Sequence, residues 1–233
     1  MMKSFRQALC RFYSSSIGKK ILVALTGLVL VGFLIGHLAA NLLIFLGADA
    51  LNDYAHKLRS MGPLLWAARL GLLAAVVLHI VATIHLTVQN RLARPDAYIV
   101  ESTLRASFSS RVMMWSGVTI AVFVVYHLMH YTWGTFNRYR DPEGPYFLAN
   151  GEHNVYKMMV DGFREPANSL FYTFAILLLC SHLRHGVPSL FQTLGLTTAR
   201  SRGLIRIAGW TFAIIIFLGY FSIPLSIMAG WVR

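Results

Sequence analysis

Histidines inside long apolar runs are the residues of this sequence whose type and spacing point to chemistry. The chain of 233 residues carries nine histidines. Seven of these lie within apolar runs: His37, His79, His85, His127, His130, His182 and His185. Polar side chains inside a membrane are costly, so they usually face the interior of a helix bundle and serve a function. Two imidazoles that face each other across a bundle can fill both axial positions of a haem iron.

Four of these histidines fall at two depths if the runs are transmembrane helices. A helix rises about 1.5 Å per residue through a hydrocarbon core about 30 Å thick. His37 and His127 then lie about 22–24 Å from the inner edge of the core. His79 and His182, on helices of the opposite direction, lie about 8 Å from that edge. The spacing predicts an outer haem on His37 and His127 and an inner haem on His79 and His182.

The other intramembrane histidines leave alternatives open. His130 and His185 each follow a proposed ligand by three residues, on nearly the same helix face, so either could replace its neighbour. His85 is expected beside the inner site or at the membrane interface. Arginines near the helix ends could pair with haem propionates or simply anchor the topology; these are Arg69, Arg111 and Arg184. No acidic residue lies within an apolar run, which argues against zinc and against an ion-coupled carrier.

Five apolar stretches are long enough to position these histidines across a bilayer, which takes about 20 residues. They cover approximately 21–46, 64–89, 112–133, 168–190 and 206–230. Only 13% of the residues are charged, against about 25% in soluble chains. The composition predicts an all-α integral membrane protein: a single membrane domain, residues 1–233, built as a five-helix bundle.

The charges predict how the bundle is oriented. Thirteen basic residues flank one set of helix ends against two acids, whereas eight basic residues face seven acids at the other set. This asymmetry places the N-terminus in the cytoplasm and the C-terminus outside. Because the basic residues cluster at helix ends and not along a stripe, the net charge of +12 does not indicate nucleic-acid binding.

One long outer loop is expected over residues 134–167. It contains the turn-rich stretch from Asp141 to Pro145 and a short amphipathic segment, Val155 to Phe163. His56 and His153 are both expected in outer loops. His153 is interpreted as a solvated surface histidine, whereas His56 has polar neighbours near the level of the outer haem and keeps a functional interpretation open.

Four stretches carry a resemblance to a known family. They are SSSIGKK at 14–20, LIGHL at 34–38, NVYKMMVDGFREPANSLFY at 154–172 and SHLRHGVPSLFQTLG at 181–195. Almost end to end, the chain resembles the di-haem cytochrome b membrane-anchor subunit of the succinate dehydrogenase and fumarate reductase family. The resemblance implies two b haems on the same four histidines, His37 with His127 and His79 with His182.

The resemblance also implies partners and a place in the bacterial inner membrane. Such a subunit anchors a flavoprotein subunit and an iron–sulfur subunit, and it exchanges electrons between the latter and membrane quinone. FAD, the iron–sulfur clusters and the succinate chemistry belong to those partner chains, and this chain has no dinucleotide-binding glycine motif and no cysteine cluster. Membrane lipid is a further partner, and the whole complex could form oligomers.

A quinone site needs an apolar slot and one or two donors near a haem. The outer candidates are Asn52, Tyr54, His56, Lys57 and Tyr131. The inner candidates are Ser15, Ser16, Lys19 and Lys20. The outer set is favoured, because two haems would serve little purpose if quinone reacted only inside. Two alternatives remain: a cytochrome b subunit of a hydrogenase or formate dehydrogenase, and a haem-free helical transporter.

Overall fold

The fold is an all-α bundle with five helices long and apolar enough to cross a membrane. The computed structural model describes residue 7 and residues 10–93 and 108–233. The spans cover Ser16–Leu46, Pro63–Leu92, Met113–Trp133, Pro166–Thr193 and Arg202–Met228. Within the described residues there is no strand, only an isolated bridge between Phe147 and His153. The predictions of a multi-pass membrane protein and of five apolar helices are therefore confirmed.

The spans are assembled from α-helices and two irregular extensions. The elements are α2 (Ser16–Asn41), η1 (Leu42–Leu46), α3 (Ala48–Ser60), α4 (Pro63–Leu92), α5 (Phe108–Arg111), α6 (Met113–His127), η2 (Leu128–Trp133), η3 (Arg138–Arg140), α7 (Val155–Arg164), α8 (Pro166–Thr193) and α9 (Arg202–Met228). The Ser15 hydroxyl caps α2 by accepting from the Gly18 amide at 2.9 Å. Proline opens α4 and α8, where its missing N–H costs nothing.

Two connections hold helices where loops were expected. Residues 48–60 form α3, so His56 lies on a helix and the prediction that places it in a loop is wrong. The 134–167 segment contains η3 and α7, and α7 covers the predicted amphipathic segment. Buried Leu51 and Asn52 hold α3 against the bundle, and this tertiary packing stabilises a short polar helix that would be marginal alone.

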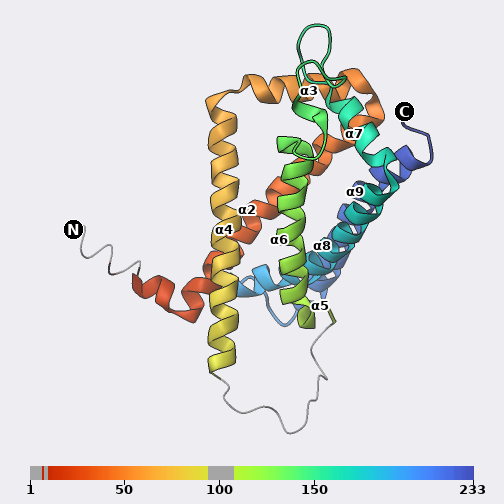
Figure 1. Cartoon of the computed structure of the whole chain (residues 1–233). Coiled ribbons are helices and arrows are strands. Elements are labelled where there is room, and N and C mark those ends of the chain that lie inside the picture. The colour runs from red at the N-terminus through yellow and green to blue at the C-terminus, as the bar shows by residue number, and fades with distance from the viewer. Residues whose placement is uncertain (1–6, 8–9, 94–107) are drawn as a thin grey trace.

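The helices pack in pairs. α2 lies along α4, α6 along α8, and α8 along α9, whereas α4 and α6 share no packed interface. In Figure 1, α2 crosses obliquely behind α4 and α6. Gly209 and Gly219 let α9 approach closely, since a Cβ there would lie 2.8 Å from Pro188 Cγ and 2.7 Å from Leu38 Cδ2 respectively. α9 therefore braces the bundle from behind and leaves the region between α2, α4, α6 and α8 for the histidines.

The two ends of the bundle differ. α3, α7 and the C-terminus lie at one end, here named the outer end, and α5 lies at the opposite, inner end (Figure 1). A buried cluster at the outer end joins η1, α3, α7, α8 and α9. The outer end is therefore covered by packed helices as well as by loops.

Four of the basic residues that contribute to the predicted charge asymmetry lie outside the described residues, namely Lys3, Arg6, Arg94 and Arg105.

Candidate functional site

The outer histidine pair faces across the bundle. His37 is on α2 and His127 is the last residue of α6. Their ring centres are 5.8 Å apart, with the ring planes 83° apart. Metal–imidazole bonds of about 2.0–2.1 Å put two opposed ring centres about 6 Å apart with one metal ion between them. The separation of these two rings therefore matches bis-histidine ligation of a single iron.

The inner pair is bordered by glycines. His79 lies on α4 beside Thr26 of α2, and His182 lies on α8 beside Ser116 of α6. A Cβ added at Gly27 would lie 3.5 Å from His79 Cε1, and one at Gly117 would lie 3.6 Å from His182 Cε1. A Cβ at either position would make only an ordinary van der Waals contact, but a side chain that extends beyond Cβ would push against an imidazole ring. The two glycines therefore help to keep the space that the rings need.

Each of the four histidines has Nδ1 within hydrogen-bond distance of a hydroxyl on another helix. The pairs are His37 with Tyr220 at 3.1 Å, His127 with Tyr172 at 3.3 Å, His79 with Thr26 at 3.1 Å and His182 with Ser116 at 3.2 Å. A metal-binding histidine typically donates its second ring N–H to such a partner, which fixes ring orientation and tautomer. The hydroxyl contacts therefore engage Nδ1 of each ring, and Nε2 is the nitrogen that could coordinate a metal.

For three of the four histidines the hydrogen-bond direction follows from the hydroxyl. Tyr220 donates to the Leu34 carbonyl at 2.9 Å, Thr26 to the Leu22 carbonyl at 2.7 Å, and Ser116 to the Met113 carbonyl at 3.0 Å. A hydroxyl has only one proton to donate. Each of these oxygens must therefore accept from the imidazole, so His37, His79 and His182 carry their proton on Nδ1. Nε2 of His79 and of His182 then keeps a free lone pair, whereas Nε2 of His37 lies 3.4 Å from the Asn41 amide nitrogen. Asn41 also contacts the His37 ring, at 3.1 Å from Nδ1.

The supporting residues of the inner pair form a pattern that the sequence interpretation missed. The same spacing occurs on two helices. On α2, Thr26 and Gly27 precede His37, and on α6, Ser116 and Gly117 precede His127. In both helices the hydroxyl residue lies eleven positions before the histidine. Eleven residues are close to three helical turns, so hydroxyl, glycine and histidine share one face. The repeated Ser/Thr-Gly-x9-His spacing is the sequence signal that could have identified these supports.

The alternative ligands have other partners. His185 Nε2 is 3.2 Å from the Ser189 hydroxyl on its own helix, and His85 Nδ1 is 2.7 Å from the Tyr13 hydroxyl. His130 is buried, and its Nδ1 lies 3.1 Å from the same Tyr172 hydroxyl that contacts His127. The π-helical turn η2 begins at Leu128, directly after His127, and both His127 and His130 have Nδ1 within hydrogen-bond distance of the Tyr172 hydroxyl. Such turns occur frequently at functional sites.

A cavity of about 460 Å³ opens between α4 and α6 on the inner side of the inner pair. Its walls are Ile84, Thr87, Val88, Arg91, Arg111, Met114 and Trp115. It thus combines an apolar interior with two arginines, one of them the predicted propionate partner Arg111. Arg184 instead stacks on Trp210 of α9, with its guanidinium carbon 3.5 Å from the ring centre.

A second group of arginines lies at the outer end. Arg69 on α4 lies over the Trp66 ring, and Arg140 donates to the Thr132 carbonyl at 2.6 and 2.9 Å. The pKa of Arg59 is lowered by loss of surrounding water and then by the charges of Arg140 and Arg69. The pKa of Arg140 is likewise lowered by desolvation and by Arg69. None of the three forms an ion pair with a described carboxylate, so this region favours an anionic group.

The outer quinone candidates do not form one site. Asn52 is buried and ties α3 to α7, accepting from the Tyr156 amide at 3.0 Å and donating to the Asn154 side chain at 3.2 Å. Tyr131 packs beneath α7, where its hydroxyl is buried without a partner among the described residues. Tyr54 and Lys57 are exposed. Of the five candidates, only His56 lines the small outer pocket described next.

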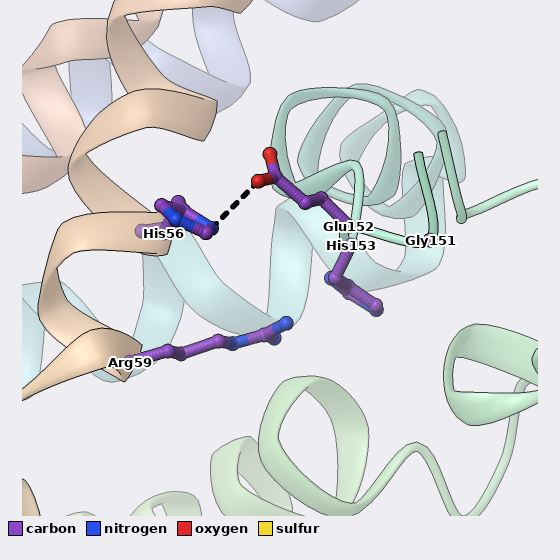
Figure 2. A pocket seen from close by; sticks show the side chains of 6 residues that line it. His56, Arg59, Gly151, Glu152 and His153 are labelled. Carbon is purple, nitrogen blue, oxygen red and sulfur yellow. Dashed lines mark ion pairs between the residues drawn. The ribbon is translucent and has the colours of Figure 1, made fainter. Parts of the chain in front are cut away.

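That pocket lies between α3 and the segment before α7. It is lined by Ala55, His56, Arg59, Gly151, Glu152 and His153. Figure 2 shows the ion pair between His56 and Glu152, whose Nδ1 and Oε1 atoms are 2.8 Å apart, with Arg59 reaching toward His153 below it. The pocket holds about 200 Å³, which is small for a ring-sized ligand.

The interpretation of His153 as a solvated surface histidine is wrong. Only 4% of the residue is exposed. Its Nε2 donates to the Tyr139 carbonyl at 2.6 Å, and its Nδ1 is buried without a partner in the described part of the chain. Burial lowers the pKa of His153, and the charges of Arg59 and Arg140 lower it further against the opposing effect of the Tyr139 carbonyl.

The inner quinone candidates lie where the N-terminal segment meets α4. Ser15 caps α2, and Ser16 and Lys20 are exposed. Lys19 is only 3% exposed, and its ammonium donates to the Ser14 carbonyl and the Gln89 side chain, both at 3.2 Å. Lys19 also lies over the Tyr13 ring. Its donors are therefore used within the chain.

The donor set of the four histidines fits two bis-histidine haems. Within the described residues no three metal-binding side chains of the His, Cys, Asp or Glu type converge on one point, as a structural zinc site requires. Imidazoles held through Nδ1, glycines beside the rings of His79 and His182, and arginines toward both ends instead fit a flat dicarboxylate macrocycle. No family model, curated protein or solved structure matches this chain.

Proposed function

We propose that this chain is the haem b membrane subunit of a succinate:quinone oxidoreductase, either succinate dehydrogenase or fumarate reductase. The observation that carries the proposal is the set of four histidines on α2, α4, α6 and α8. The rings of His37 and His127 lie 5.8 Å apart, and Nδ1 of each of the four is held by a hydroxyl of a neighbouring helix. Haem b, when bound at both pairs, supplies one-electron carriers at two levels of the membrane.

The chain's own residues would hold and orient these groups. His37 and His127 present Nε2 at the outer level, and His79 and His182 do so at the inner level. Arg91 and Arg111 offer guanidinium groups to carboxylates at the inner end, and the outer arginines do so at the opposite end. Hydroxyl anchors on α2, α6, α8 and α9 keep the imidazoles from rotating, so that the ligand geometry is organised before binding.

In such an enzyme, this chain would be a membrane subunit that does not itself carry the succinate-oxidising site. A flavoprotein partner would oxidise succinate, an iron–sulfur partner would pass electrons to this chain, and membrane quinone would exchange them with it. The charge asymmetry supports a bacterial inner-membrane location with the N-terminus in the cytoplasm. Of the two quinone regions, the outer end remains the better candidate, because the inner Lys19 donors are already used within the chain.

The test of haem ligation is a pyridine haemochrome assay and a redox titration of the purified complex. Two b haems per chain are expected. His37→Ala and His127→Ala should lose the same haem, and His79→Ala and His182→Ala the other. His85→Ala is the matched control, because His85 lies on α4 but bonds to Tyr13, and it should keep both haems. Absence of haem, or loss of one haem in all four variants, would refute the proposal.

The test of the partner is the protein that co-purifies. A subunit with bound flavin and succinate- or fumarate-linked quinone activity would support the assignment. A nickel or molybdenum protein in its place would identify a hydrogenase or formate dehydrogenase complex, even with both haems present.

A further inference from the structure

Tyr172 differs from the other three hydroxyl partners of the histidine pairs. The hydroxyls of Thr26, Ser116 and Tyr220 each donate to a main-chain carbonyl and are thereby fixed as acceptors. The Tyr172 hydroxyl lies instead between two imidazoles, 3.3 Å from His127 Nδ1 and 3.1 Å from His130 Nδ1. Its single proton can go to only one of them.

Haem ligation by His127 decides the direction. If Tyr172 donated to His127, the imidazole proton would lie on Nε2, and that nitrogen could not bind iron. His127 must therefore donate from Nδ1 to Tyr172, and Tyr172 must donate to His130 Nδ1. His130 then carries its own proton on Nε2. The three side chains form one directed chain of hydrogen bonds that ends on an imidazole.

A second observation indicates that His130 is not present merely to fill space. The residue is 1% exposed, and its Nε2 is buried without a partner among the described residues. Burying an unpartnered polar group costs about 1–3 kcal/mol, so an apolar residue would suit the packing better. His130 stacks on Tyr131, with ring centres 4.1 Å apart, and lies near Tyr139 and Tyr172. This aromatic surrounding holds the ring with Nδ1 toward Tyr172.

We propose that Tyr172 and His130 are positioning residues for the outer haem: His130 accepts the Tyr172 proton and so makes Tyr172 a hydrogen-bond acceptor for His127. The inference rests on the proposed function, since it concerns a haem at His37 and His127. Hydrogen bonds in a chain strengthen one another, so the acceptor strength of Tyr172 depends on residue 130. The potential of the outer haem would thus depend on His130 through Tyr172, whereas main-chain carbonyls fix the hydroxyl partners of the other three ligands.

The first experiment is a redox titration of the purified complex carrying Tyr172→Phe. A hydrogen bond from Nδ1 makes an imidazole more basic, which favours ferric iron. Losing it should raise the reduction potential of the outer haem, with about a tenfold change in the reduction equilibrium constant, or 59 mV for one electron. The inner haem should not change. Outer and inner haems are assigned from the His37→Ala and His79→Ala variants.

The second experiment distinguishes the directed hydrogen-bond chain from His127 through Tyr172 to His130, here called the relay, from a general packing role of His130. His130→Leu removes the acceptor and should shift the outer haem in the same direction as Tyr172→Phe, whereas His130→Asn keeps an acceptor near Nδ1 and should restore most of the wild-type potential. The shifts from Tyr172→Phe and His130→Leu should not add in the double variant, because both break one chain. Tyr220→Phe is the matched control: its hydroxyl supports His37 without His130, so its shift should add to that of His130→Leu.

The outcomes distinguish the two proposals. A wild-type complex without two haems would overturn the proposed function and the relay together. Two haems in the wild type with an unshifted outer potential in Tyr172→Phe would overturn the relay alone, as would additive shifts for Tyr172→Phe and His130→Leu. Tyr172→Phe itself could fail to retain the outer haem, and the two His130 variants then decide. The relay is supported if His130→Asn retains the outer haem, whereas His130→Leu loses it or shifts its reduction potential. Equal behaviour of those two variants overturns it.

Discussion

The outer and inner histidine pairs occupy the same four helices, but different kinds of residue support them. The inner pair, His79 and His182, has a short hydroxyl and a glycine beside each ring, from α2 and α6. The outer pair, His37 and His127, has tyrosine partners from α8 and α9. Tyr172 also belongs to the buried cluster that joins α7, α8 and α9 at the outer end.

This difference shows how sensitive each pair should be to changes elsewhere. The inner supports are adjacent residues on two helices that pack directly against their partners, α2 along α4 and α6 along α8. The outer supports depend on α9 and on the cover formed by α3 and α7. The inner geometry is therefore set by a few local residues, and the outer geometry by how the outer end packs as a whole.

The largest effect is expected from enlarging an inner glycine. Gly27→Leu should displace the His79 ring, because even a Cβ at this position would lie 3.5 Å from it, and the inner haem should be lost while the outer haem stays. Gly27→Ala adds only an ordinary van der Waals contact and should retain both haems. Haem content and redox titration measure this. Loss of both haems in Gly27→Leu would show that the two pairs are not independent.

Removing an inner hydroxyl should have the next largest effect. Thr26→Val keeps the side-chain shape but removes the acceptor for His79 Nδ1, and the loss of such a partner typically weakens metal binding by about 10–100-fold. The inner haem should dissociate more readily in a haem-transfer assay, and Thr26→Ser, which keeps the hydroxyl, should behave like the wild type. Unchanged retention in Thr26→Val would mean that glycine packing alone positions this ring.

The outer cover should be weakened by Asn52→Ala. This change removes two hydrogen bonds between α3 and the start of α7, and leaving their buried partners unpaired costs about 1–3 kcal/mol. Hydrogen exchange should accelerate in α7 and not in α4. Asp53→Ala, on the exposed side of α3, is the matched control. Uniform acceleration across the bundle would contradict the idea of a separate outer cover.

A smaller, pH-dependent effect is expected at His153. Its pKa is lowered in the folded protein, mainly by burial, so below the ordinary value of 6.5 the unfolded segment binds a proton that the folded one does not. The local stability should therefore fall as the pH drops through 6.5. Limited proteolysis of residues 141–154 at pH 7.5 and pH 5 measures this. His153→Gln, which can still donate to the Tyr139 carbonyl, should make cleavage independent of this group.

Much of the frame could be predicted from the sequence. Apolar length determines spans in a bilayer because every backbone group must be satisfied within the helix, and the five observed helices overlap the five predicted runs. A fixed rise per residue converts position into depth, which is why His37 and His127 could be placed at one level. The structure has their rings 5.8 Å apart.

Other features could not be predicted because they depend on contacts between segments distant in sequence. α3 is too polar to be recognised as a packed helix, and its stability comes from Leu51 and Asn52 at the bundle. His153 looks like a solvated loop histidine in the sequence, but the structure buries it beside Phe147 with its Nε2 bonded to the Tyr139 carbonyl. The preference for His127 over its neighbour His130 likewise depends on tertiary packing, because α2 brings the His37 ring to 5.8 Å from the ring of His127.

The sequence by itself determined the membrane class and the five spans and predicted two levels of histidine, because hydropathy and helical rise are local properties of the chain. Only the tertiary structure decided which hydroxyl holds each imidazole, which helix braces the others and which histidines are already paired. Those choices depend on how the helices lie against one another, and a hydrogen bond between helices exists only when the packing brings its donor and acceptor to about 3 Å.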